Sequence, residues 1–329
     1  MARRPRRIRR GKLYEVTLKT FQARYFFVPS RWLNLLLVGV LAYCQQRFGL
    51  RFCSVTFLSN HAHLLIRADE PDQVRDFFCL ANSQISKEAQ RICGWTGGIF
   101  RRRCSIIEVT DRPEAQIARL EYCLSQGVKE GLCPDPESWP GVQSMKAWLT
   151  GSMSLPGVWV NRGELYELER RGRWKIRAVR KILTKAQRKL CESRLTLRLS
   201  PLPCWDHLNP KELRREANAM RDRIVERNAD QIAKIRPGWR KRLMNPELRT
   251  FRPDATAKSD EPRVYASSME EWQSWVREYD EWWTFYERAS MRLRLGIEAA
   301  LREFPEDCFI PSGVFPRSYD GLPPPAAAA

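Results

Sequence analysis

Along the first 133 residues, stretches with the alternation typical of strands take turns with stretches that have helical spacing. Four segments rich in β-branched and aromatic side chains are predicted to be strands, at residues 14–20, 51–58, 61–68 and 100–110. Three segments bounded by capping residues, proline or glycine are predicted to be helices, at residues 30–48, 71–93 and 111–127. The resulting order is strand, helix, strand, strand, helix, strand, helix.

This order predicts an α+β fold of the ferredoxin-like, split βαβ type, in which an antiparallel sheet carries helices on one face. Ser59 and Asn60 form the turn of a hairpin between the second and third strands. After residue 133 the amino-acid composition changes. The sequence is first rich in Pro, Gly and Trp and then strongly basic. Two further helices are predicted there, at residues 210–236 and 268–304.

Composition shifts along the chain predict five segments. They are a basic arm at 1–12, the α+β domain at 13–133, a linker or irregular cap at 134–160, a basic and mainly helical region at 161–320, and a disordered tail at 321–329.

The charge balance points to a polyanionic partner. Lys and Arg total 57 against 38 acidic residues, which gives a net charge of +19, and nucleic acid is the leading candidate. The longest apolar run, residues 33–42, is far shorter than the roughly 20 residues that span a bilayer, so no membrane span is expected. The 10 cysteines form no Cys-x-x-Cys pair, and no apolar segment follows the basic start. We therefore expect a cytoplasmic protein with free thiols.

Candidate chemistry centres on two of the three histidines. His61 and His63 lie two residues apart in a predicted strand, so their side chains share one face, where they can converge on a metal ion or can be ordinary core residues. Tyr122 and Gln126 lie four residues apart in a predicted helix, so a phenol and an amide also share a face.

Three ordered blocks of sequence carry a family resemblance. Residues 60–65 (NHAHLL) resemble the HUH motif of single-tyrosine transposases, in particular the REP-associated tyrosine transposases. Residues 97–103 (GGIFRRR) and 122–132 (YCLSQGVKEGL) resemble the two blocks that follow in that family. Ser59 stands where the family has proline, and Gln126-Gly127 replaces Asn-Pro but keeps an amide. The resemblance covers about residues 13–133.

The resemblance implies an HUH endonuclease fold with Tyr122 as the nucleophile and His61, His63 and Gln126 as ligands of Mg²⁺ or Mn²⁺. The implied reaction is metal-dependent cleavage and strand transfer of single-stranded, hairpin-forming (REP-like) DNA through a 5′-phosphotyrosine. A bacterial, nucleoid-associated protein is implied as well.

Further side chains are weaker candidates. Glu108, near the end of the fourth predicted strand, is a possible metal ligand or base, and a structural carboxylate is the simpler interpretation. Basic residues predicted to contact DNA phosphates, which as solvated side chains would have no such role, are Arg3, Arg4, Arg6, Arg7, Arg101, Arg102, Arg103 and Lys129.

Two other functions fit the same residues. A domesticated, non-catalytic DNA-binding or regulatory protein would share the scaffold, and the loss of Asn-Pro together with the long C-terminal region favours it. A replication initiator or relaxase shares the histidine pair, but its flanking blocks differ. Monomer and homodimer are equally compatible with the sequence.

Overall fold

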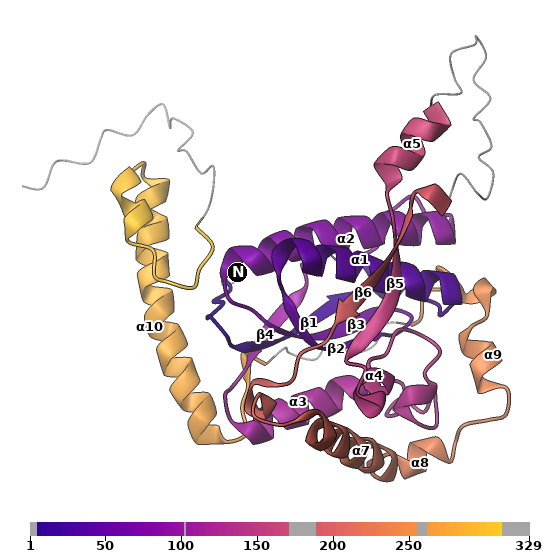
Figure 1. The fold of residues 1–329 in the computed structure, drawn as a ribbon. Coiled ribbons are helices and arrows are strands. Elements are labelled where there is room, and N and C mark those ends of the chain that lie inside the picture. Colours follow the sequence, from indigo (N-terminus) through magenta and orange to yellow (C-terminus); the bar gives the residue numbers. More distant parts are fainter. Residues whose placement is uncertain (1–4, 102, 171–188, 255–261, 311–329) are drawn as a thin grey trace, which may run out of the picture.

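The computed structural model describes residues 5–101, 103–170, 189–254 and 262–310, and its centre is a five-stranded sheet (Figure 1). The strands follow the spatial order β2-β3-β1-β4-β7. They are β1 (Leu13–Lys19), β2 (Arg51–Phe57), β3 (His61–Arg67), β4 (Ser105–Val109) and β7 (Val264–Tyr265). All pairings are antiparallel except that of β4 with β7. The predicted α+β class and split βαβ order are confirmed.

Helices cover both faces of this sheet, which corrects the expectation of one covered face. In Figure 1, α1 (Arg31–Phe48) and α2 (Pro71–Cys93) lie above the sheet and α3 (Pro113–Leu124) lies below it. The hydroxyl of Thr56 on β2 donates to the backbone carbonyl of Cys123 on α3 at 2.9 Å. Six consecutive residues of β1 are buried, and such a strand needs cover on both sides.

The ends of the first two helices follow local chemistry. The Ser30 side chain accepts a hydrogen bond from the Leu33 amide, and Gly49 ends α1 with a φ of 70°. Pro71 occupies the first turn of α2, and Gly94 ends that helix with a φ of 62°. These bounds match the predicted ones, whereas α3 begins at Pro113 and ends at Leu124, three residues before the predicted end.

The rest of the chain adds mainly short elements. They are α4 (Met145–Thr150), β5 (Ser154–Val160), α5 (Arg162–Arg170), β6 (Glu192–Arg198), α7 (Pro210–Arg227), α8 (Ala229–Ile232), α9 (Trp239–Leu243) and α10 (Met269–Arg294). Short 3-10 helices lie at Phe21–Ala23, Pro136–Ser138, Pro203–Trp205, Pro246–Leu248 and Glu298–Arg302. Within the described ranges, no helix has the length and apolar character required to cross a bilayer.

Several predicted features of this half take a different form. The helix predicted at 210–236 is interrupted at Asn228, between α7 and α8, and the one predicted at 268–304 ends at Arg294. Trp139 and Trp148, in the segment predicted to be a linker or cap, are buried in the main core. The predicted disordered tail, 321–329, lies outside the described residues, and the division into domains stays a prediction.

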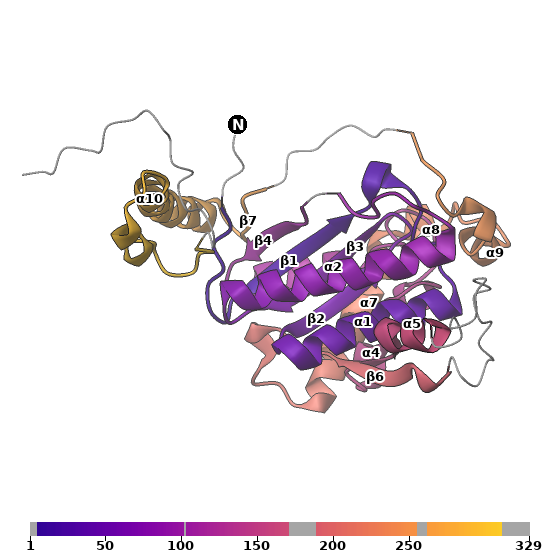
Figure 2. The ribbon, with the colours of Figure 1, turned by 90° about the horizontal axis from the view of Figure 1, so that it is seen from above.

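The N-terminal residues pack against the C-terminal helix. Ile8 is fully buried, and the Tyr279 hydroxyl on α10 donates to the Pro5 carbonyl at 2.8 Å. In Figure 2, α10 lies beyond β7, at the edge of the sheet. Residues 5–9 are therefore held against the protein, so this part of the basic arm at 1–12 is packed on the fold.

Helix α1 meets the hairpin of β5 and β6 at two glycines. A Cβ on Gly39 would overlap the backbone carbonyl of Val158, and one on Gly157 would overlap the backbone of Gly39. Only glycine at these two positions allows the hairpin to lie directly on α1.

Replacement of Gly39 by alanine should therefore destabilise the protein. We expect Gly39→Ala to lower the free energy of unfolding by about 1–3 kcal/mol, the usual cost of overpacking, as measured by urea denaturation. Gly163→Ala in α5, where the nearest atom to the added Cβ is 3.5 Å away, is the control and should be neutral or stabilising. Equal losses of unfolding free energy in the two variants would contradict the close approach of the β5–β6 hairpin to α1.

Candidate active site

The two histidines of β3 point to the face that α3 covers. Their ring centroids are 5.0 Å apart. Nδ1 of His61 lies 2.8 Å from Oδ1 of Asn60, and Nδ1 of His63 lies 2.5 Å from a carboxylate oxygen of Glu15. Because both partners are oxygen acceptors, each Nδ1 carries the proton and each Nε2 keeps a free electron pair. Both imidazoles are thus in the tautomer that binds a metal through Nε2.

Gln126 adds a third donor to this pair. Its amide nitrogen donates to the Tyr122 carbonyl at 3.0 Å, which leaves its carbonyl oxygen for the hydrogen-bonding contact with His61. Burial, followed by electrostatic interactions with His63 and Lys129, lowers the pKa of His61 to about 3. His61 is therefore neutral near pH 7. The Gln126 side chain is hydrogen-bonded to the His61 imidazole, so the two groups lie close enough to bind the same cation.

Tyr122 stands beside this group on α3. Its ring centroid is 5.6 Å from that of His63, and the side chain is 36% exposed, so solvent and a ligand can reach it. The Arg119 guanidinium lies 3.6 Å from the ring centroid, and the Lys129 ammonium lies 3.8 Å from it. Both side chains thus make cation–π contacts with the Tyr122 ring.

The structure thus brings together His61, His63, Tyr122, Gln126 and Lys129 from the sequence-derived set. Sequence reasoning missed Glu15, Arg119 and Tyr265, which complete the group.

Glu15 is the buried centre of this group. Its side chain is 1% exposed, its second oxygen forms an ion pair with the Arg119 Nε at 2.5 Å, and it is hydrogen-bonded to the Tyr265 hydroxyl. Burial raises the pKa of Glu15, but the hydrogen bond from His63 and the charge of Arg119 outweigh it and hold the pKa below the usual value. The one sequence signal was an acidic residue inside an otherwise buried strand.

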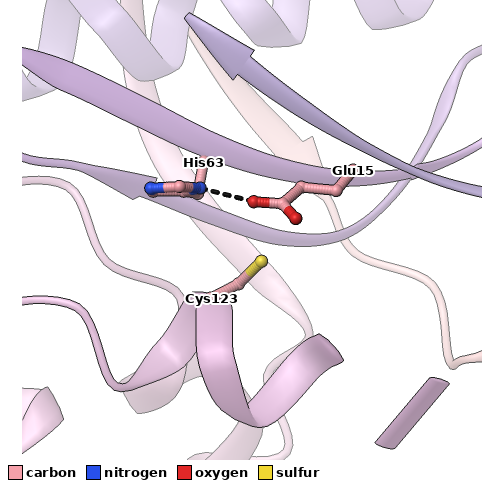
Figure 3. A group of neighbouring side chains, drawn as sticks. All are labelled: Glu15, His63 and Cys123. Carbon is pink, nitrogen blue, oxygen red and sulfur yellow. Dashed lines mark hydrogen bonds and ion pairs between the residues drawn. The ribbon is translucent and has the colours of Figure 1, made fainter. Parts of the chain in front are cut away.

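Glu15, His63 and Cys123 also form a compact group that could bind a metal (Figure 3). Their ligand atoms lie within 4.8 Å of one another. Burial raises the pKa of the Cys123 thiol well above its ordinary value, so the sulfur is protonated, and Glu15 already has three partners. A metal in this group would displace a proton from Cys123 and the hydrogen bond from His63.

Glu108 does not join the site, which corrects its candidacy as a ligand or base. It pairs with Tyr14 across the sheet, one residue out of phase with Glu15, and so points to the opposite face. There its carboxylate binds Arg9 and accepts hydrogen bonds from Trp275 Nε1 at 3.0 Å and the Tyr14 hydroxyl at 3.3 Å.

The other predicted DNA-contacting residues have separate positions. Arg6 donates to the Cys104 carbonyl, and Arg7 lies 3.9 Å from Glu278, so both are engaged within the protein. Arg101 and Arg103 are exposed in the loop before β4. The remaining three, Arg3, Arg4 and Arg102, lie outside the described residues.

Comparisons with known proteins give two solved structures of similar fold. One is a REP-associated tyrosine transposase bound to a REP hairpin, with 14% identity and a TM-score of 0.38 over 46% of this chain and 86% of that one. The other is a candidate transposase from Deinococcus radiodurans R1, with 16% identity and a TM-score of 0.27 over 37% of this chain and 98% of that one. No family model and no curated protein matches the chain.

The two buried carboxylates provide a matched pair for mutagenesis. We expect Glu15→Gln and Glu108→Gln each to lower the free energy of unfolding by about 1–3 kcal/mol, because each removes a buried anion that is paired with an arginine. Only Glu15→Gln should shift the side-chain ¹⁵N resonances of His63. A His63 shift of similar size in Glu108→Gln would show that the two faces of the sheet are not independent.

Proposed function

We propose that this protein cleaves and rejoins single-stranded DNA with Tyr122 as the nucleophile and a divalent metal held by His61, His63 and Gln126. The observation that supports it best is the position of Tyr122, whose ring centroid lies 5.6 Å from that of His63. A partly exposed phenol, two imidazoles and an amide oxygen are the parts that such a transfer requires.

The three donors fit a hard divalent cation. Two imidazole nitrogens and one amide oxygen carry no charge and leave coordination positions open for water and a phosphate oxygen. Such a set suits Mg²⁺ or Mn²⁺, and the imidazoles favour Mn²⁺. A bound ion would act as a Lewis acid on the scissile phosphate. Glu15 holds His63 in the ligating tautomer.

The chain's own residues then perform the transfer. The Tyr122 oxygen attacks the phosphorus and loses its proton to solvent. The P–O3′ bond breaks, and the leaving O3′ takes up a proton from solvent, which gives a 5′-phosphotyrosine and a free 3′-hydroxyl. Arg119 and Lys129 stabilise the developing phenolate, since both cations lie within 4 Å of the ring centroid. Attack by another 3′-hydroxyl on the phosphotyrosine reforms a diester and restores Tyr122.

Hairpin-forming DNA is the proposed substrate, and the bacterial nucleoid is the proposed location. The net charge of +19 suits a polyanion, and the exposed Arg101 and Arg103 can bind phosphates. A duplex would hold its backbone away from a nucleophile that lies against a sheet, so unpaired DNA is the better fit. The three sequence blocks add the preference for REP-like hairpins.

Covalent adduct formation tests the nucleophile. Incubated with Mn²⁺ and a pool of hairpin-bearing single-stranded oligonucleotides, the protein should form an adduct that is stable on a denaturing gel. Tyr122→Phe should abolish the adduct while hairpin binding persists, and Tyr166→Phe, which replaces an exposed tyrosine on α5, is the control. An adduct that survives Tyr122→Phe would refute the assignment. Hairpin binding without an adduct in either metal would favour the non-catalytic DNA-binding alternative.

Metal binding distinguishes the two groups that share His63. We expect Gln126→Ala to weaken Mn²⁺ binding by roughly tenfold or more, as loss of a ligand or of its support does, whereas Cys123→Ala should leave it unchanged. Electron paramagnetic resonance of free Mn²⁺ gives both affinities directly. The opposite pattern would place the metal in the Glu15–His63–Cys123 group.

A further inference from the structure

A trough is lined on one side by residues of α3, among them Tyr122. It has a volume of about 620 Å³ and lies between α3, the C-terminal end of α7 and the residues that follow β7. Two of its three walls thus come from residues 224–228 and 265–267, far from the histidines in the sequence. Tyr122 belongs both to the trough and to the site on the sheet.

The walls of the trough combine apolar surface with charges of both signs, because Glu114 and Glu121 line it together with three cationic side chains. Ala118, Ile224 and the rings of Tyr122 and Tyr265 supply the apolar part. Arg119 lies between the two rings, 3.6 Å from the Tyr122 centroid and 3.8 Å from the Tyr265 centroid. A guanidinium stacked on aromatic rings in a cleft favours a planar ligand that carries negative charge.

Further cations lie at the rim. Arg227 is 71% exposed while it pairs with Glu121 at 2.6 Å, and Lys129 lies next to Tyr122. The volume falls within the range of pockets that bury a ligand of one or two nucleotides. A nucleotide supplies both properties of the ligand, since its base is planar and its phosphate is anionic.

We propose that this trough binds the unpaired nucleotides that flank the phosphate attacked by Tyr122. The proposal rests on the function proposed above and adds a binding role for the C-terminal half of the chain. Bases stack against Tyr265 and the apolar wall at Ala118, and the phosphates face Arg227 and Lys129. Residues 224–228 and 265–267 then select the sequence next to the cleavage point.

Filling the trough tests this proposal without any need for cleavage. Ala118 is exposed on α3, so Ala118→Trp places a ring in the trough and leaves the core intact. Two probes are compared in a Tyr122→Phe background by fluorescence anisotropy. One is a DNA hairpin with a randomised single-stranded flank, and the other is the same hairpin with a blunt stem.

We expect Ala118→Trp to weaken binding of the flanked hairpin by about tenfold, the loss expected when a base can no longer stack. Binding of the blunt hairpin should be unchanged. Ala299→Trp, which adds the same ring at an exposed position in the 3-10 helix after α10, is the control and should affect neither probe.

Two results would overturn the proposal. One is equal affinity of Ala118→Trp and Ala299→Trp for the flanked hairpin, which would show that the flank does not enter the trough. The other is a photoreactive base in the flank that crosslinks only to residues that do not line the trough. A failure of the proposed cleavage reaction is distinguishable from both results. In that case the wild type forms no covalent adduct, but Ala118→Trp still binds the flanked hairpin more weakly.

Discussion

The buried carboxylate of Glu15 is the contact on which the site depends. From β1 it reaches His63 on β3, Arg119 on α3 and Tyr265 on β7. A carboxylate this deeply buried is stable as an anion only when its partners are all in place. The tautomer of His63 and the position of Arg119 against the Tyr122 ring are therefore set by one charge. If any one of these elements is displaced, the Glu15 carboxylate is exposed to solvent or left without a partner.

A second carboxylate ties the opposite face of the same sheet. Glu108 on β4 binds Arg9 from the N-terminal segment and Trp275 from α10. Strand β7 and helix α10 follow each other in the chain, so one C-terminal segment contacts Glu15 on one face and Glu108 on the other. Two anchors on two faces hold the edge of the sheet, although β7 itself is only two residues long.

The features that could be predicted from the sequence are those that depend on residues close together in the chain. Ser30 and Gly49 fix the ends of α1 because a hydroxyl satisfies free amides at its start and only glycine adopts the left-handed turn at its end without cost. The positions of His61, His63, Tyr122 and Gln126 followed from residue spacing in a strand and a helix. These signals lie within a few residues of the feature that they specify.

What the sequence did not predict depends on contacts between distant segments. Tyr265 reaches Glu15 from 250 positions along the chain, and no local pattern marks so short a strand. The face of Glu108 depends on the register of β4 against β1, because a shift of one residue would turn it toward the histidines. The cover on both faces of the sheet likewise depends on where α3 docks.

The exposure of Tyr122 suits two demands on the nucleophile that we propose it to be. A polymeric substrate must reach the phenol oxygen, so the side chain cannot be buried, but a free tyrosine would sample many orientations. Arg119 and Lys129 resolve this by contacting the ring rather than the hydroxyl, which keeps the oxygen accessible. Arg119 is itself fixed by Glu15, and so the rigidity of the buried charge extends to a side chain at the surface.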